Sequence, residues 1–411
     1  MSATNKLKIF NDPIYGFITI PNSLIYDLIQ HPYFQRLRRI SQMGMSYLVY
    51  PGAHHTRFHH ALGCMHIMQK AVQTLRFKGV FISVEEENAL YIAILLHDIG
   101  HGPFSHAMEN SIVDEVHHEE ISLKFMNALN TEFDGNLDLA IQIFKGDYHR
   151  KFMLQLISSQ LDMDRMDYLK RDSFYSGVAE GNINSDRLIQ MMNVQDDVLV
   201  IEEKGIYSVE KFLVARRLMY WQAYLHKTSV VAEITLTKIL KRAKELTQKG
   251  EQLECSKSLS FFLNNKITSD TFNLDELITF SQLDDYDVLG AIKSWQLHTD
   301  FVLSSLSKMI INRDLLKIIV LDEKVNAEQL LKYKNKIISL YSLSDKEASY
   351  FVFKGKLKNQ AYNKESEPIR ILRKDGEIEN LVDSSDLLQV KALSKSVTKY
   401  YICFPKVLID T

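Results

Sequence analysis

The chain has 411 residues, of which 46% are hydrophobic and 24% are charged, and this composition indicates an ordinary globular protein with a sizeable core. The formal net charge of −2 argues against a surface built mainly to hold duplex DNA, so a nucleic-acid partner is not indicated. The three cysteines are far apart, which excludes a disulfide framework and favours a reducing compartment. No signal peptide is apparent and no apolar run is long enough to span a bilayer, so we expect a cytoplasmic protein without a membrane partner.

Hydrophobic periodicity and the scarcity of proline and glycine (7 and 16 residues) predict long helices. In chain order, helices are predicted at 22–43, 57–77, 85–98, 118–129, 136–144, 151–170, 185–191, 208–245, 257–264, 275–281, 285–297, 300–309 and 326–340. Short strands are predicted at 7–10, 17–20, 196–201, 205–208, 350–353, 369–372 and 400–404, with a turn at Asp375–Gly376. The fold class is therefore mainly α: a helical core with small β elements at 1–250, a helical extension at 251–340 and a small α+β C-terminal region at 341–411.

Histidines are concentrated in one stretch of the chain. Ten of the 14 lie between His54 and His118, and acidic residues stand beside them. A single histidine is most often simply tolerated, and the His54–His55 pair by itself is typical of an exposed loop. The cluster as a whole favours a metal centre, because a catalytic ion needs imidazoles and carboxylates from several rigid elements, with positions left open for water and substrate.

His97 and Asp98 stand together at the end of an apolar predicted helix, which Gly100 breaks. Neighbouring helix positions point about 100° apart, so both side chains can hold one ion only near a helix end or a cavity. The dipeptide alone is a weak signal, but HDIGHGPFSH is far more specific. Its glycines allow the backbone to approach a ligand closely, and it presents His101 and His106 just after the helix.

Arg57 and His60 in TRFHHALG lie one helical turn apart, so the guanidinium would project near whatever His60 binds, as a phosphate clamp does. Without that context Arg57 is as well explained as an ordinary surface residue.

The segment SSQLDMDRMDYLKRD places three polar side chains on one helix stripe: Asp164, Tyr168 and Asp172. Asp167 and Arg171 share a different face and are predicted to form an i,i+4 ion pair. The alternative interpretation of this segment is a solvated helix, but a tyrosine and two carboxylates on one stripe suit a site better.

The ordered set FNDPIYG, HPYFQRLRRI, YPGAHHTRFHHALG, HDIGHGPFSH, DMDRMDYLKRD and AYLHK resembles the HD-domain deoxynucleoside triphosphate triphosphohydrolases. These include bacterial dNTPases and the mammalian dNTPase with a sterile-alpha-motif domain. The resemblance covers residues 5–230 in order and with family-like spacing. It implies an HD-domain helical core, hydrolysis of a dNTP to deoxynucleoside and inorganic triphosphate, and assembly into a homo-oligomer. It also implies a divalent metal ion, with Zn, Mn, Fe, Ni and Mg all left open.

The resemblance assigns roles to individual residues. The metal ligands that it implies are those that the chemistry of the cluster suggests: His60, His97, Asp98 and Asp164. For catalysis it places His101 and His118 at the phosphates, and His106 beside the scissile bond as general acid with Glu109 behind it. Phosphate and nucleotide contacts are implied for Arg57, Arg165, Arg216 and Tyr224. At the sugar it implies Gln42 and Met43, with Tyr168 pressing on C2′ and Asp172 binding the 3′-hydroxyl.

One position departs from the family pattern. The mammalian relative carries an acidic residue that reads guanine at an activator site just before its PxFQRLR segment, and this chain has Gln30 there, although Gln35 and Arg38 persist. Whether a nucleotide activates the protein is therefore left open.

Two other functions compete with dNTP hydrolysis. Another HD-type phosphohydrolase, such as a nucleotide phosphatase or a phosphodiesterase, would share the metal centre but does not need the sugar-reading stripe. A non-catalytic nucleotide-binding regulator would be expected to have lost a metal ligand or the acid, and none is lost here.

Overall fold

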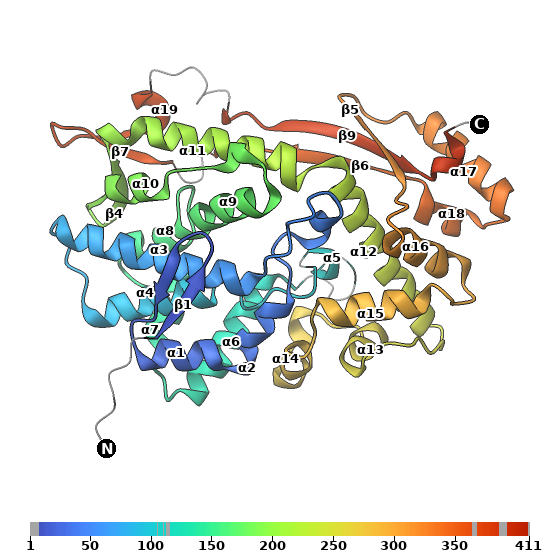
Figure 1. Ribbon diagram of the computed structural model, residues 1–411, viewed down its shortest axis with the longest axis horizontal. Helices are drawn as coiled ribbons and strands as arrows, with labels where there is room; N and C mark the ends of the chain where they lie inside the picture. The colour runs from blue at the N-terminus through green and yellow to red at the C-terminus, as the bar shows by residue number, and fades with distance from the viewer. Residues whose placement is uncertain are drawn as a thin grey trace.

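The computed structural model describes residues 8–104, 106–109, 111, 116–363, 368–385 and 393–409. The chain is mainly α-helical, which confirms the predicted fold class (Figure 1). Its first half holds α1 (Ser23–Gln30), α2 (Pro32–Gln35), α3 (Arg57–Phe77), α4 (Val84–Leu96), α5 (His106–Glu109), α6 (His118–Glu132), α7 (Asp138–Lys145), α8 (Lys151–Ile157), α9 (Met163–Ser176) and α10 (Ser185–Met191). Its second half holds α11 (Ile206–Met219), α12 (Lys227–Thr247), α13 (Lys257–Asn264), α14 (Leu274–Phe280), α15 (Asp285–Trp295), α16 (Phe301–Ile311), α17 (Ala327–Tyr341), α18 (Asp345–Phe351) and α19 (Leu381–Ser384).

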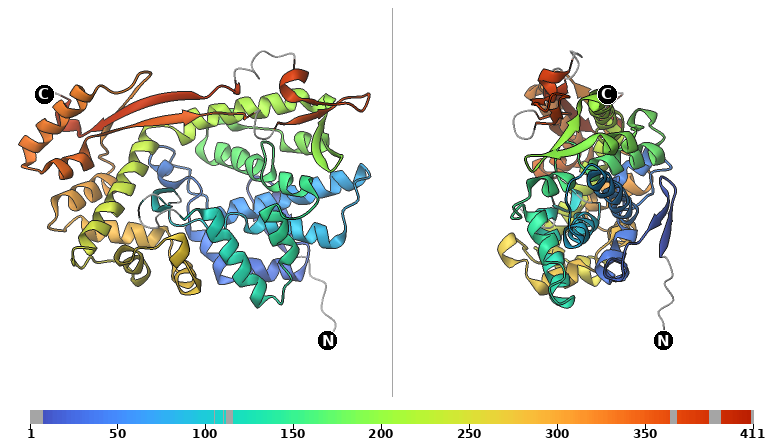
Figure 2. Two further views of the ribbon diagram at one scale, coloured as in Figure 1. Left: turned by 180° about the vertical axis from the view of Figure 1, so that it is seen from behind. Right: turned by 90° about the vertical axis from the view of Figure 1, so that its left-hand side faces the viewer.

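Short strands form three sheets within the described residues. A hairpin pairs β1 (Ile9–Asp12) with β2 (Gly16–Thr19). The second sheet has the order β3 (Met192–Gln195), β4 (Val198–Glu202), β7 (Arg370–Leu372) and β8 (Ile378–Asn380). The third is antiparallel, in the order β5 (Lys317–Leu321), β9 (Val397–Phe404) and β6 (Phe353–Asn359), and it runs along one edge of the molecule (Figures 1 and 2). Since β4 and β5 pair with later strands, the C-terminal region shares both larger sheets with the preceding chain.

Three of the predicted helices are wrong in their continuity. The helix predicted at 22–43 ends at Gln30, because Pro32 starts a new helical turn and disfavours helical backbone before it. The helix predicted at 151–170 is divided into α8 and α9, because the Asp162 side chain closes a turn on the Ser159 N–H and caps α9 through the Arg165 N–H, both at 2.7 Å. The helix predicted at 208–245 is interrupted by a π-helical turn at Tyr220–Tyr224.

Two strand predictions are also wrong. Residues 205–208 do not form a strand, since α11 begins at Ile206. In the segment 350–353, Tyr350 and Phe351 belong to α18, and β6 begins only at Phe353. Strand β5 was not predicted at all. Its residues pair with β9 (Ile318 with Cys403), which lies far along the chain.

Helix α4 delivers two candidate ligands into the interior. All its residues from Ala89 to Leu96 are buried, and a helix that is apolar on every side belongs in a core. It packs against α3 and α7, and α3 packs against α9, so the end of α4 places His97 and Asp98 near α3 and α9. Although this stretch is apolar, neither α4 nor any other described helix is long and apolar enough to cross a membrane.

Candidate active site

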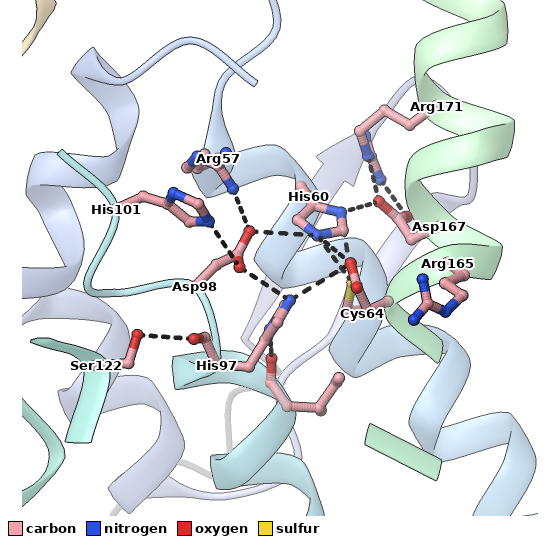
Figure 3. A network of polar contacts seen from close by, with 12 residues as sticks. Arg57, His60, Cys64, His97, Asp98, His101, Ser122, Arg165, Asp167 and Arg171 are labelled. Atoms are coloured by element: carbon pink, nitrogen blue, oxygen red, sulfur yellow. Dashed lines mark hydrogen bonds and ion pairs between the residues drawn. The ribbon is translucent and has the colours of Figure 1, made fainter. Parts of the chain in front are cut away.

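The four residues predicted as metal ligands come together, and Figure 3 shows three of them, His60, His97 and Asp98, facing one another. His60 lies in the first turn of α3, His97 and Asp98 directly follow α4, and Asp164 lies in the first turn of α9. His60 Nε2 is 3.1 Å from an oxygen of Asp164 and 3.7 Å from an oxygen of Asp98. His97 Nε2 is 3.5 Å from Asp98 and 3.6 Å from Asp164. The cluster therefore unites imidazole and carboxylate donors that the sequence holds far apart.

His60 is oriented from behind by a buried carboxylate. Its Nδ1 lies 2.8 Å from Asp167, and Asp167 also accepts hydrogen bonds of 2.8 and 3.0 Å from Arg171, which donates to Asp12 at 2.7 Å. The predicted Asp167–Arg171 ion pair is thus confirmed, but both side chains are 0% exposed instead of lying on a solvated face. Because the carboxylate accepts the proton of Nδ1, Nε2 presents its lone pair to the cluster.

Gly63 on α3 permits this packing. A Cβ atom at Gly63 would lie 2.0 Å from an oxygen of Asp167 and 2.2 Å from a nitrogen of Arg171. Helices α3 and α9 can therefore approach closely enough for the ion pair to reach His60.

His97 is oriented by its own helix and by α6. Its Nδ1 is 2.6 Å from the carbonyl oxygen of Ile94, and Ser122 on α6 donates to the His97 carbonyl at 2.8 Å while it accepts the Gly100 N–H at 2.9 Å. A Cβ atom at Gly100 would lie 2.2 Å from the carbonyl oxygen of His118. At this glycine, helix α6 comes close to the backbone, in place of the ligand that the sequence suggested.

The electrostatics of the cluster favour added positive charge. Burial opposes protonation of both imidazoles, yet Cys64, Asp164 and Asp167 hold the pKa of His60 well above its ordinary value, and Asp98 and Asp164 raise the pKa of His97. Burial also opposes ionisation of Asp164, but the two histidines keep its pKa below its ordinary value. A metal ion would supply the same positive charge as these protons.

The donor set fits a divalent ion. His97 Nε2 is buried and has no hydrogen-bond partner among the described residues, so a ligand atom is left unused at the centre of the cluster. Donors about 2.1 Å from one ion, at roughly 90° to 110°, lie about 3.0 to 3.4 Å apart, close to the separations seen here. Cys64 also places its thiol within 4.8 Å of the ligand atoms of His60, His97 and Asp164. The residues present are therefore compatible with the metal that the sequence predicts.

A second group of side chains adjoins the cluster on the side of α6. Asp98 accepts a hydrogen bond from Arg57, and its other oxygen is 3.3 Å from His101 Nε2. The rings of His101 and His118 stack with centroids 3.9 Å apart. Burial, reinforced by Arg57, lowers the pKa of His101 to about 3, so His101 is a neutral imidazole at physiological pH. Arg57 is buried and is not the surface residue that the sequence left as an alternative.

A pocket of about 550 Å³ opens over this region. Its lining includes the predicted ligands His97, Asp98 and Asp164 together with His118 and Lys145. Arg57 and His101, two of the predicted phosphate contacts, lie against Asp98, which lines this pocket. The predicted metal site is therefore accessible to a ligand.

Several of the residues predicted at the nucleotide lie on α9 or beside it. The Tyr224 hydroxyl donates to Asp172 at 2.8 Å, and the Tyr168 ring meets the Tyr224 ring edge to face at 6.1 Å. Arg216 donates to Gln160 at 3.3 Å. Helix α9 thus carries Asp164 at the predicted metal site, and it carries Tyr168 and Asp172 beside a group of aromatic side chains.

The structure describes the side chains of some of the remaining predicted residues but not of all. Gln42 and Met43 precede a short 3₁₀ turn, and the backbone N–H of Gln42 is bonded to the carbonyl oxygen of His55. Arg165 is ion-paired with Asp162 at 3.1 Å and donates to the carbonyl of Ser159. The side chains of His106 and Glu109 lie outside the described parts of the chain, so their predicted roles stay predictions.

Several supporting residues were not predicted from the sequence. Asp12 belongs to the quoted segment FNDPIYG but was given no role, and Ser122 carries no motif. The sequence favours an exposed loop at His55, yet its side chain is fully buried. These residues act through partners more than 20 positions away, which no local spacing reveals.

Comparisons with known proteins identify the family of the chain. Residues 57–172 match the family model of the HD domain, and residues 183–260 match that of the HD associated region. The crystal structure of a phosphohydrolase from Bacteroides thetaiotaomicron is 51% identical, with a TM-score of 0.94 over 97% of this chain and 100% of that chain. The Bacillus subtilis protein YwfO is 33% identical over 98% of this chain and 93% of its own length. The Dictyostelium discoideum deoxynucleoside triphosphate triphosphohydrolase SAMHD1 homolog is 30% identical over 62% of this chain and 52% of its own. The chain belongs to the HD-domain phosphohydrolase family.

Proposed function

We propose that the protein hydrolyses deoxynucleoside triphosphates to deoxynucleoside and inorganic triphosphate. The observation that carries the proposal is the course of helix α9: Asp164 joins the metal-type cluster at its start, and Asp172 joins Tyr224 near its end. One rigid element thus connects a phosphate-cleaving centre with groups suited to a sugar and base. The similarity to a dNTP triphosphohydrolase of Dictyostelium supports this choice over a broader phosphohydrolase.

His60, His97, Asp98 and Asp164 would hold the divalent ion, which when bound supplies Lewis-acid activation of water and of a phosphate oxygen. Zn, Mn, Fe, Ni and Mg all suit this donor set, and the affinity order of metals does not choose among them. Cys64 beside the cluster adds a softer donor.

The chain's own residues would handle charge and protons. Arg57 donates to Asp98 next to the cluster and would stabilise charge that grows on the phosphate oxygens, together with His101, His118 and Arg216. His106 would protonate the departing 5′-oxygen, oriented by Glu109. Tyr168, Asp172, Gln42 and Met43 would form the wall against the sugar, and Arg165 and Tyr224 would contact the nucleotide.

Product analysis tests this function. The purified protein is incubated with each dNTP and NTP and several divalent metals, and the products are separated by ion-exchange chromatography. Release of inorganic triphosphate and deoxynucleoside supports the proposal. Release of orthophosphate or pyrophosphate instead would identify a nucleotide phosphatase or another HD phosphohydrolase. A nucleotide activator and a homo-oligomer stay predictions from the family, and the same assay with mixed nucleotides, together with light scattering, tests both.

A further inference from the structure

The neighbours His54 and His55 differ sharply in environment. His54 is exposed, whereas the His55 side chain is 0% exposed and its ring stacks on Tyr175, with 4.4 Å between centroids and 13° between planes. Burying a polar ring is costly unless its nitrogens form hydrogen bonds. The partners of His55 should therefore explain why a histidine stands at this position.

One ring nitrogen of His55 holds Asp172. Nε2 lies 2.7 Å from Asp172 Oδ1, while the Tyr224 hydroxyl donates to Oδ2 at 2.8 Å. A carboxylate only accepts hydrogen bonds, so Nε2 carries the proton. Burial and the nearby Asp172 raise the pKa of Tyr224 well above its ordinary value, so its hydroxyl stays a donor. Asp172 is thus fixed by one donor on each oxygen, and each oxygen retains a further lone pair for a ligand hydroxyl.

The backbone of His55 holds a second residue of the proposed sugar wall. The Gln42 N–H donates to the His55 carbonyl at 3.0 Å, and the adjacent Ser41 and Thr56 form an isolated β-bridge. Gln42 Oε1 and His55 Nδ1 are both buried, and neither has a hydrogen-bond partner in the described part of the chain. His55 therefore connects Gln42 with Asp172. In this group, Gln42 Oε1 and His55 Nδ1 can still form hydrogen bonds.

We infer that His55 is a positioning residue that aims Asp172 at the 3′-hydroxyl of the substrate, so that the protein discriminates against nucleotides that lack this hydroxyl. The inference rests on the dNTPase function proposed above and extends it to a residue with no assigned role. Asp172 has to accept the hydrogen bond of the hydroxyl in one orientation of its carboxylate. A carboxylate that two donors already hold loses little conformational entropy when it binds the hydroxyl. Without His55 the carboxylate could rotate toward Tyr224 or toward solvent.

The test compares dATP with 2′,3′-dideoxy-ATP in the full-length, metal-loaded protein and three variants. His55→Leu removes the donor, His55→Gln places an amide N–H near the position of Nε2, and His54→Leu is the matched control at the exposed neighbour. The wild type should favour dATP in kcat/KM. His55→Leu should lower kcat/KM for dATP by roughly 10- to 100-fold, as expected for a hydrogen bond to a charged group, and should change the dideoxy rate by less than about 3-fold. His55→Gln should recover most of the preference, and His54→Leu should behave as wild type.

Each outcome decides the inference. If His55→Leu lowers both rates equally, or leaves the ratio of the two rates unchanged, His55 only packs the core and the inference is overturned. If Leu lowers the melting temperature strongly, His55→Asn, whose amide matches Nδ1 and not Nε2, takes its place beside Gln. If the wild type hydrolyses neither nucleotide, the proposed function fails by itself. The inference is then decided by calorimetric binding of the same two nucleotides to wild type and His55→Leu, and a preference for dATP that is the same in both proteins would refute it.

Discussion

Two carboxylates on α9, three residues apart, show two uses of negative charge. Asp167 is 0% exposed and is closed off by His60 and Arg171, so its charge is satisfied inside the protein. The Asp164 side chain is 30% exposed, lines the 550 Å³ pocket and faces the Nε2 atoms of His60 and His97. The first carboxylate fixes the geometry of a neighbour, and the second stays available to an ion and a substrate. Changes on the open side should therefore affect metal and turnover, and changes on the closed side should also affect stability.

The largest effect is expected on the open side. His97→Ala combined with Asp98→Ala removes two proposed ligands, so bound metal and turnover should both fall to background. The helical circular dichroism spectrum should persist, because the ligands follow α4 and are not part of its apolar body. Metal content is measured by mass spectrometry. A purified double variant with full metal occupancy would remove the metal assignment.

The next largest effect concerns the proposed proton donor. His106→Ala should lower kcat by roughly 10² to 10⁴-fold, the usual contribution of general acid catalysis, while metal content and dNTP binding stay near normal. The loss should shrink with a nitrophenyl phosphodiester, whose leaving group needs no proton, if the site accepts one. Loss of metal would instead make His106 a ligand. Equal losses on both substrates would assign His106 to the phosphate charge.

On the closed side, Asp167→Asn removes the negative charge that Arg171 and His60 share and leaves one acceptor oxygen. The free energy of unfolding should fall by about 3 to 5 kcal/mol, because buried Arg171 loses one of its two carboxylate partners and keeps only Asp12. Metal affinity should also drop about 10- to 100-fold, because His60 loses its orienting carboxylate. Denaturant titration and metal competition measure the two quantities. Asp186→Asn is the control: it removes the exposed ion pair with Lys70 and should cost less than about 1 kcal/mol. Equal effects of the two variants would show that the buried contacts of Asp167 with His60 and Arg171 do not stabilise the fold.

A smaller effect is expected at the sugar. Tyr168 lies on the same helix as Asp172, and its ring packs against Tyr224. A preformed pocket rejects polar groups to which it cannot form hydrogen bonds. Tyr168→Ala should therefore reduce the preference for dATP over ATP by about tenfold, with metal content unchanged. Steady-state rates on both nucleotides provide the test. A wild-type protein that hydrolyses dATP and ATP equally well would contradict the sugar wall.

The last effect concerns acid stability. Burial opposes ionisation of Asp167, but Arg171 and His60 outweigh it and lower its pKa to about 2. Because the pKa of Asp167 is lower in the folded state than its unfolded value near 3.9, the ionised carboxylate stabilises the fold at a pH above about 3.9. This contribution is lost as the pH falls through about 2. Between about pH 4 and 2 the wild type should therefore lose about 2 kcal/mol that Asp167→Asn does not lose. Parallel stability curves for the two proteins would show that Asp167 is not ionised in the fold.

The parts of the fold that depend on local pattern were predicted well. The bounds of α3, α10 and α13 agree with the sequence prediction, because their apolar spacing and their ends are encoded nearby. The division at Asp162 and the π-helical turn at Tyr220–Tyr224 were missed, since periodicity continues across both. Strand β5 was missed because its partner β9 is formed by residues more than 70 positions later.

The candidate site follows the same rule. The proposed ligands were accessible from residue type, spacing and family resemblance, and the fold brings their donor atoms together. The residues that orient other side chains of the site were not accessible in this way, because Asp12 contacts Arg171 and His55 contacts Asp172 across more than 100 positions. Spacing along a helix revealed the Asp167–Arg171 pair, but only packing against Gly63 shows that the pair lies behind His60.

In the proposed reaction, the metal-loaded protein cleaves dNTPs at the α-phosphorus. Hydrolysis of dATP in ¹⁸O-labelled water, followed by mass spectrometry of the products, is the decisive test of this reaction. One ¹⁸O atom is expected in inorganic triphosphate and none in deoxyadenosine, and no turnover is expected after removal of the metal by chelation. Label in deoxyadenosine, or labelled orthophosphate or pyrophosphate in place of triphosphate, would contradict it.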